Sequence, residues 1–284
     1  MTTRPRKFGV STHLYHGDRL TRDHLLQIAR HGFEAIDVFA TRTHVDYGNA
    51  STVADLQQWL AEAGLELHGV HAPTSESYAA GRSGLPLTLA SLDSQERMRA
   101  LEEAERALHI ARRIPFEVFV THIGVPRSEQ RSPADNSRDA ARRSIEALHR
   151  VAEPLGVRLA VEVIPNELSR AASLVHFVEE VVDAPGLGIC LDFGHAHLDG
   201  DLVETIETVS EHLVTIDVHD NRGRTDDHLV PFDGSIDWPA ALTAIQKVGY
   251  EGTLLLELAA RGSPRETLVR AQKARERMEK LLQR

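Results

Sequence analysis

The stretch GICLDFGHAH, at residues 188–197, decides the fold that this sequence predicts. An apolar run ends there in Asp192, and a glycine and two histidines follow. Further along the chain, VTIDVHDN at residues 214–221 repeats the pattern, with His219 after the apolar run. Apolar runs bounded by glycine and polar residues are typical of buried parallel strands. Enzymes built on parallel strands place their chemistry at the strand ends, so we expect the site of this chain there.

Six further apolar runs fit the same pattern, and helical segments separate them. The predicted strands cover residues 7–13, 34–40, 65–71, 116–122, 157–163, 186–192, 213–219 and 253–258. The predicted helices cover residues 21–31, 52–63, 93–113, 133–155, 171–182, 202–210, 236–248 and 264–282. Strict alternation of strand and helix predicts an α/β fold with a parallel sheet and right-handed crossovers. Eight such units favour a single (β/α)8 TIM barrel domain over residues 1–284, with an open doubly wound sheet as the alternative.

The connections between these elements differ in length at the two ends of the strands. Most helix-to-strand turns are short, whereas the strand-to-helix connections at residues 72–92, 123–132 and 220–235 are long. Long loops without predicted structure of their own are often functional. In a barrel, all three lie at the C-terminal ends of the strands. That face is therefore the predicted active-site face.

Composition narrows the class of partner. The chain carries a formal net charge of −10 and a sequence pI near 5.9, which disfavours nucleic acid as the main partner. The first ten residues contain no apolar signal segment, and no run is long enough to span a bilayer, so we expect a cytoplasmic protein without a membrane partner. The single cysteine, Cys190, rules out an intramolecular disulfide and is interpreted as a small core residue.

Side chains that bind metals stand at or near the ends of most predicted strands. They are His13, His71, His122, Glu162, Asp192 with His195, His219 with Asp226, Asp227 and His228 in its loop, and Glu257. In a closed barrel these positions converge on one mouth. Carboxylates mixed with imidazoles suit a divalent ion such as Zn²⁺, Mn²⁺, Co²⁺, Fe²⁺ or Mg²⁺, with zinc or manganese favoured.

Two of these residues, Glu162 and Glu257, need a cation close to their carboxylates. Glu162 and Glu257 lie inside the apolar runs LAVEVI and LLLELA, where an unpaired carboxylate is costly. No lysine or arginine lies within either run, so the neutralising cation must come from elsewhere. A metal ion meets this need, and an ion pair to a neighbouring strand is the alternative.

The other members of the set have simpler alternatives when each is taken alone. A histidine at a strand end can hydrogen-bond a neighbouring carbonyl, which applies to His13, His71 and His122. Asp192 can cap a helix that begins after it. The cluster of Asp226, Asp227 and His228 can be a solvated turn. The joint pattern across several strands favours a metal site over all of these.

Together these motifs resemble the xylose-isomerase-like TIM barrels. That superfamily joins sugar and sugar phosphate isomerases and epimerases with apurinic endonucleases of the endonuclease IV type. The resemblance covers essentially the whole chain. It is carried by Glu162, Asp192-Phe193-Gly194-His195, Val218-His219-Asp220, Asp226 with His228, Phe232-Asp233-Gly234-Ser235-Ile236-Asp237-Trp238, and Glu257.

The resemblance to the ketose 3-epimerase branch implies an isomerase or epimerase of a small sugar or sugar phosphate. In that branch one divalent ion is held by four residues, which match Glu162, Asp192, His219 and Glu257. The two glutamates would also be catalytic, removing and returning a proton through an enediolate. His195 matches the substrate-binding histidine of the branch.

The resemblance to endonuclease IV implies a different reaction, a metal-dependent phosphodiester cleavage on a trinuclear zinc cluster. Its additional ligands match His71, His122, Asp226 and His228, with His195 in a second-metal role. Against it, Glu162 is followed by VIPN rather than the Asn-Thr-Ala-Gly type of run in that family, and the chain is acidic. A non-catalytic binding barrel is the third hypothesis, and it requires the buried glutamates to lack a metal.

Further candidates for substrate binding lie around the mouth. His13 ends the first strand, and Arg222 and Arg224 follow His219 closely enough to bind a phosphate or carboxylate. Ordinary solvated loop arginines are the alternative. Barrels of this kind often pair, so a homo-oligomer is compatible with the predicted fold.

Overall fold

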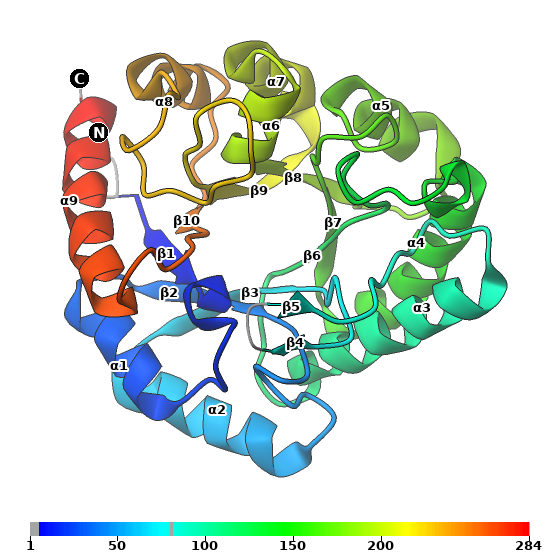
Figure 1. Ribbon diagram of the computed structural model, residues 1–284, viewed down its shortest axis with the longest axis horizontal. Helices are drawn as coiled ribbons and strands as arrows, with labels where there is room; N and C mark the ends of the chain where they lie inside the picture. The colour runs from blue at the N-terminus through cyan, green and yellow to red at the C-terminus, as the bar shows by residue number, and fades with distance from the viewer. Residues whose placement is uncertain (1–5, 80–81, 284) are drawn as a thin grey trace.

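The computed structural model describes residues 6–79 and 82–283, and its parallel strands close into a barrel (Figure 1). Around the barrel the order is β1, β2, β3, β6, β7, β8, β9 and β10, and β10 pairs with β1 in parallel. Closure confirms the predicted (β/α)8 TIM barrel and excludes the open sheet. The strands are β1 (Phe8–Ser11), β2 (Ala35–Phe39), β3 (Glu66–His71), β6 (Val118–Thr121), β7 (Arg158–Glu162), β8 (Gly188–Asp192), β9 (Leu213–Val218) and β10 (Leu254–Leu256).

Helices surround the barrel on its outside (Figure 1). They cover the outward faces of the strands, which explains why nearly every strand residue is buried and why the strands read as continuous apolar runs. The helices are α1 (Arg22–Arg30), α2 (Ala50–Ala63), α3 (Ser94–Leu108), α4 (Arg138–Ala152), α5 (Ala171–His176), α6 (Phe193–Asp199), α7 (Leu202–Val209), α8 (Trp238–Lys247) and α9 (Pro264–Leu282).

The interior of the barrel is filled by side chains rather than open. A small apolar cluster inside it consists of Val118, Val120, Ala160 and Cys190, separate from the large core between strands and helices. Cys190 is fully buried, as predicted for a core residue, and its thiol donates to Asp217 Oδ2 at 3.1 Å. Because side chains fill the interior, we expect a ligand to bind at the mouth, where the strands end.

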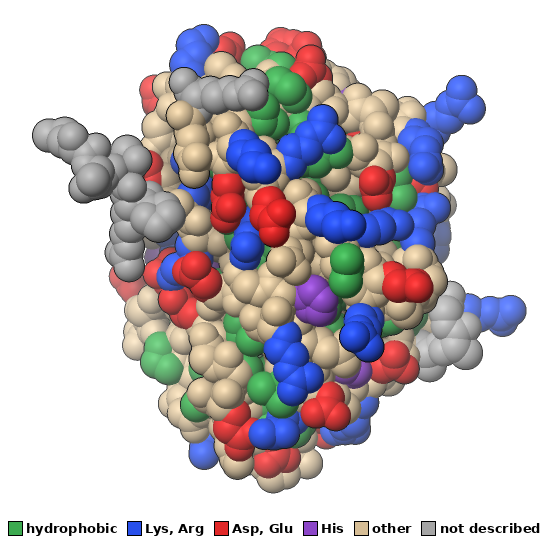
Figure 2. Space-filling model, turned by 90° about the vertical axis from the view of Figure 1, so that its left-hand side faces the viewer, with side chains coloured by type: hydrophobic (Ala, Val, Ile, Leu, Met, Phe, Trp, Pro, Cys, Tyr) green, Lys and Arg blue, Asp and Glu red, His purple; other side chains and the backbone are tan. Residues whose placement is uncertain are grey.

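The outer surface carries charges of both signs. On the face that includes α9 and α1, lysines and arginines are interspersed with aspartates and glutamates (Figure 2). None of the helices in residues 6–79 and 82–283 is long and apolar enough to cross a membrane.

Several element boundaries differ from those predicted. The connection at 72–92 was expected to lack structure, but it contains an antiparallel pair, β4 (Tyr78–Ala79) and β5 (Arg82–Ser83). Strands this short leave no periodicity to detect. Residues 80–81 of that connection, and residues 1–5 and 284 of the predicted domain, lie outside the described residues.

The predicted helices at 93–113 and 133–155 are also interrupted. The first ends as an α-helix at Leu108 and continues as a 3-10 turn, His109–Arg112. The second begins with a separate turn, Pro133–Asp135, before α4 starts. One helix, α6, was not predicted as a helix at all, although Asp192 was considered as a cap for one.

Candidate active site

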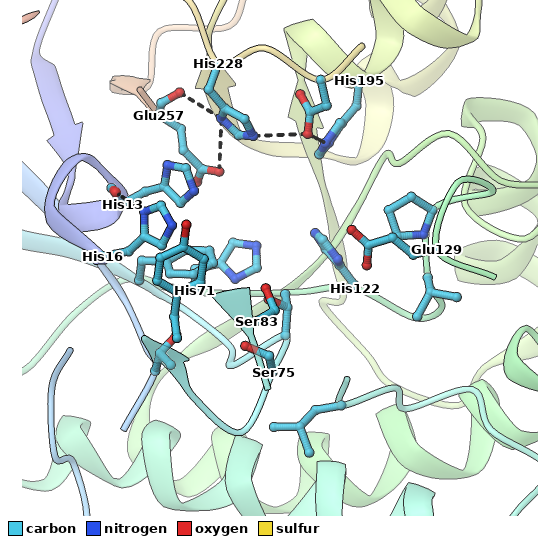
Figure 3. A pocket seen from close by; sticks show the side chains of 18 of the residues that line it. His13, His16, His71, Ser75, Ser83, His122, Glu129, His195, His228 and Glu257 are labelled. Atoms are coloured by element: carbon cyan, nitrogen blue, oxygen red, sulfur yellow. Dashed lines mark hydrogen bonds and ion pairs between the residues drawn. The ribbon is translucent and has the colours of Figure 1, made fainter. Parts of the chain in front are cut away.

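Most of the predicted strand-end residues line a cavity of about 180 Å³ at the mouth of the barrel (Figure 3). Glu162, Asp192 and His219 are not among its lining residues. Histidines from several different strands and loops point into it, together with Glu257 after β10. These lining histidines are His13, His16, His71, His122, His195 and His228. The cavity therefore collects imidazoles that are far apart in the sequence, as closure of the barrel requires.

Glu162 is the hub of the inner part of the site. It is the last residue of β7, is only 2% exposed, and its two carboxylate oxygens are contacted by three histidines. His71 Nε2 and His122 Nε2 donate to Oε2 at 2.9 and 3.0 Å, and His195 Nδ1 donates to Oε1 at 2.9 Å. Burial alone would raise the pKa of Glu162, but these histidines, with His122 the strongest, hold it well below its ordinary value.

His71 makes two hydrogen bonds, one to a backbone carbonyl and one to Glu162. Its Nδ1 donates to the carbonyl of Ala72 at 2.8 Å, which is the simple structural role considered for it. That contact fixes the ring so that Nε2 faces Glu162, the arrangement typical of a metal-ligating histidine. Burial lowers the pKa of His71, but the hydrogen bond and charge of Glu162 outweigh it and raise the pKa to about 10. An imidazolium thus supplies the cation that buried Glu162 needs.

Asp192 and His219 form the next part of the site, at the ends of β8 and β9. Asp192 Oδ1 accepts from the backbone N–H of His195 at 2.6 Å, so Asp192 does cap α6. The same oxygen lies 2.9 Å from His219 Nε2. Asp192 Oδ2 and both ring nitrogens of His219 are buried without a hydrogen-bond partner among the described residues.

These unpartnered atoms fit a divalent cation. A buried carboxylate oxygen and imidazole nitrogens that lack hydrogen bonds are costly unless an ion occupies the space between them. Gly194 leaves space for the His219 ring, because a Cβ at position 194 would lie 1.9 Å from Cε1 of that ring. The donor set of carboxylates and imidazoles suits zinc or manganese.

Asp226 links the loop after β9 to the strand ends. Its Oδ2 accepts from His195 Nε2 at 3.0 Å and from His228 Nε2 at 3.1 Å (Figure 3). His228 in turn donates from Nδ1 to the carbonyl of Glu257 at 3.1 Å. His195, His219, Asp226 and His228 bring ligand atoms within 4.8 Å of one another. Asp226 and His228 therefore line the cavity, whereas Asp227 contacts Arg261 Nη2 at 2.6 Å and is not among the lining residues.

Glu257 lies across the cavity from His122 (Figure 3). It is 6% exposed, and it groups with His13 and His228 as a third set of candidate ligands. Burial raises its pKa to about 7, against the opposing charges of His228 and His71. A carboxyl group with a pKa near neutrality is suited to proton transfer.

A column of stacked imidazoles connects Glu257 to the outer cavity. His13 stacks on His16 and on His228, with ring centroids 4.2 and 4.6 Å apart, and His228 stacks on His219 at 4.0 Å. His13 Nδ1 donates to the carbonyl of Leu258 at 3.1 Å. Burial, reinforced by His228 and His16, lowers the pKa of His13 well below its ordinary value. Neutral His13, which lines the cavity, therefore retains Nε2 as a hydrogen-bond acceptor.

The structure distributes the four predicted ligands over different groups, and no group found among the described residues contains all four. Glu162, Asp192, His219 and Glu257 come from β7 to β10, which are neighbours in the barrel. Glu162 and Asp192 share a group with His195, and Glu162 also belongs to a group with His71 and His122. That a metal ion binds in one of these groups stays a prediction.

Arg222 and Arg224 are not brought to the cavity. Both side chains are exposed, and neither lines it. Asn221 fixes the loop here, since its Oδ1 accepts from the backbone N–H of Gly223 at 2.8 Å, and Gly223 turns the chain with a φ of 70°. The placement agrees with the alternative of solvated loop arginines.

Sequence reasoning missed several residues of the cavity lining, among them His16 and Glu129, and gave no role to Asp220. His16 and Glu129 line the cavity from loops. Asp220 lies below it and accepts from Phe232 N, Gly234 N, Ile236 N and Trp238 Nε1. The spacing of His13 and His16 on one turn was an available signal for His16, but nothing in the loop sequence singled out Glu129.

The model of one protein family matches residues 25–281, and its description is "Xylose isomerase-like TIM barrel". The chain belongs to the xylose isomerase-like TIM barrel family. This confirms the family to which the motifs pointed.

One curated relative and two solved structures align with most of this chain. The uncharacterised protein MJ1311 of Methanocaldococcus jannaschii is 27% identical over 258 residues, covering 88% of this chain and 83% of its own. The solved structure of a D-tagatose 3-epimerase-like protein is 25% identical, with a TM-score of 0.78, covering 98% and 97% of the two chains. An IOLI protein solved with a zinc atom is 18% identical, with a TM-score of 0.75, covering 96% and 98%, and its likeness shows the fold alone.

Proposed function

We propose that this protein is a divalent-metal-dependent isomerase or epimerase of a small sugar. The observation that carries the proposal is the placement of two buried carboxylates: Glu257 lines the cavity, and Glu162 is held by the cavity-lining His71, His122 and His195. One is stabilised as the anion and the other has a pKa near neutrality, which suits them to different steps of a proton transfer. The D-tagatose 3-epimerase-like neighbour supports the sugar as substrate class.

The proposed reaction is a proton transfer between two carboxylates and one carbon of the sugar. One carboxylate removes the proton from the carbon next to the sugar carbonyl, and the electron pair moves to the carbonyl oxygen to give an enediolate. The other carboxylate returns a proton from the opposite face, which inverts that carbon. A metal held by Glu162, Asp192, His219 and Glu257 would supply Lewis-acid stabilisation of the negative charge on the oxygen. His13 and His195 orient the hydroxyl groups.

A conversion assay with a panel of ketoses and aldoses tests the proposal. Glu257→Gln removes a proton carrier while keeping the size of the side chain. We expect it to lower kcat at least about a hundredfold on the best substrate. Asp233→Asn, an exposed change distant from the cavity lining, serves as control. Full activity of Glu257→Gln on that substrate would remove this residue from the mechanism.

A second function is favoured by one specific observation. His71 and His122 with Glu162, and His195 with Asp226 and His228, make two further groups of candidate ligands beside Asp192 and His219. A site with two or three metals is typical of phosphodiester cleavage. Elemental analysis separates the two, since the epimerase requires about one divalent ion per chain and the phosphodiesterase two or three. Chelator-sensitive incision of a duplex with an abasic site would favour the phosphodiesterase.

A further inference from the structure

The charged side chains that line the cavity are acidic or imidazole groups. Asp226, Glu129 and Glu257 line it, and no lysine or arginine is among the lining residues in the described part of the chain. Proteins recognise phosphate groups mainly through arginine, lysine or backbone N–H groups at helix N-termini. The inner carboxylates face histidines and candidate metal ligands, but Glu129 belongs to none of those groups.

Glu129 is exposed, and backbone hydrogen bonds fix the turn that carries it at the outer part of the cavity. Its backbone N–H donates to the carbonyl of Pro126 at 2.9 Å, which closes a turn. The start of that turn is fixed by Val125, whose N–H donates to Asn136 Oδ1 at 2.7 Å and whose carbonyl accepts from Asn166 Nδ2 at 2.9 Å. Figure 3 shows the carboxylate of Glu129 beside His122, turned toward the cavity.

Arg127 and Arg131, the two basic residues nearest to Glu129 along the chain, do not neutralise it. Arg131 contacts Glu96 Oε2 at 3.5 Å and Asp135 Oδ1 at 3.7 Å. Arg127 contacts Glu167 Oε1 at 3.2 Å and Asp199 Oδ1 at 3.8 Å, both outside the cavity lining. No ion pair of Glu129 is present among the described residues. The hydroxyl groups of Ser75 and Ser83 also line this outer region, on the side below His71 in Figure 3.

We propose that Glu129 determines substrate specificity by accepting hydrogen bonds from hydroxyl groups and repelling phosphate, so that the substrate is an uncharged, unphosphorylated polyhydroxy compound. The proposal rests on the proposed function and narrows its substrate class. A carboxylate accepts well from two neighbouring hydroxyls, whereas a phosphate dianion beside it is disfavoured by like charge. Ser75 and Ser83 supply hydroxyls that can complete the contacts to a sugar chain.

Binding measurements test this without requiring turnover. Metal-loaded protein is titrated calorimetrically with xylitol, ribitol and arabinitol, and with the 5-phosphate of each. We expect the best free pentitol to bind more tightly than its phosphate by on the order of tenfold or more. Glu129→Lys should reverse the preference, and Glu129→Gln should reduce it. Glu211→Lys, an equal change of charge at an exposed residue before β9, should leave it unchanged.

The outcomes distinguish a failure of the specificity role of Glu129 from a failure of the proposed epimerase function. Tighter binding of a pentitol phosphate by the unmodified protein, an unchanged preference in Glu129→Lys, or no binding of any pentitol would overturn the specificity role. Selective pentitol binding without conversion of any sugar would sustain it while contradicting the epimerase. Conversion of a ketose phosphate in preference to the free ketose would sustain the epimerase and overturn the role of Glu129.

Discussion

Gly194 lies so close to His219 that any side chain at position 194 would collide with the imidazole ring. A Cβ on Gly194 would lie 1.9 Å from one ring atom of His219 and 2.3 Å from another. We expect Gly194→Ala to displace the imidazole, to destabilise the fold by about 1–3 kcal/mol, and to lower the bound metal content. Thermal unfolding and elemental analysis measure both effects.

A second glycine provides the control for that substitution. A Cβ on Gly48 would meet only Asp46 Oδ1, at 3.5 Å, an ordinary contact. Gly48→Ala should therefore leave metal content unchanged. Equal metal content in Gly194→Ala and the unmodified protein would show that His219 has room to move without loss of the site.

His44 gives a pH dependence that is independent of the site. It is 1% exposed, its Nδ1 donates to the carbonyl of Asp18 at 2.6 Å, and burial lowers its pKa to about 4. The unfolded chain binds a proton near pH 6.5, so the stability that neutral His44 provides is present above pH 6.5 and is lost as the pH falls toward 4. That loss amounts to roughly 3 kcal/mol.

Urea unfolding at several pH values measures this contribution. His44→Gln keeps a donor for the Asp18 carbonyl but cannot be protonated, so its stability should fall less steeply between pH 6.5 and 4. An unchanged slope would contradict the assignment. Other histidines whose pKa is lowered by burial, such as half-buried His24 and buried His68, leave part of the slope in the variant.

Residues at strand ends were predictable because all strands of a parallel barrel end on the same face. Glu162 and Glu257 stood out as acids inside apolar runs, and both are buried at the mouth. Glu129 and His16 were not predictable, because a loop residue's direction depends on contacts such as those that fix Val125. The sequence also could not reveal that Asp192 serves as helix cap and candidate ligand together.

At the scale of elements, the loop between β9 and α8 depends on Asp220. Its carboxylate accepts four hydrogen bonds across the loop, including one from the indole of Trp238 at 2.8 Å. Asp220→Asn places an amide where N–H groups converge, so we expect a loss of about 2–4 kcal/mol in unfolding free energy. Metal affinity should fall as well, because the loop carries Asp226 and His228.

Urea denaturation and metal titration measure both losses. The control is Asp233→Asn in the same loop, where the carboxylate is 43% exposed and pairs with Arg270. It should cost no more than about 1 kcal/mol. A variant of Asp220 with normal stability and metal affinity would show that the loop is held by other contacts.

Element types were predicted better than their ends. All eight barrel strands were located, since the helices cover them and leave apolar runs. The end of α3 at Leu108 and the break before α4 were not, because the 3-10 turns there continue the helical spacing of apolar residues. α6 begins directly after β8, so the apolar residues of the two elements form one run.

At the scale of the whole molecule, closure of the barrel makes the site. The neighbouring strands β7, β8, β9 and β10 each end at or just before one predicted ligand, Glu162, Asp192, His219 or Glu257 in that order. Alternation of strand and helix predicted this arrangement, but only the closed structure shows that His71 and His122 from β3 and β6 reach Glu162. The sequence therefore predicted that these residues gather at one end of the barrel but not their contacts, and their roles as ligands stay predictions.

The most direct test of a metal-dependent proton transfer is uptake of solvent deuterium into a sugar substrate, followed by NMR. With the metal-loaded protein in D2O, we expect deuterium at one carbon next to the carbonyl. Uptake should stop after chelation, return with zinc or manganese, and be absent in Glu257→Gln. Turnover of the sugar without any deuterium at that carbon, or uptake that survives complete removal of metal, would contradict the account.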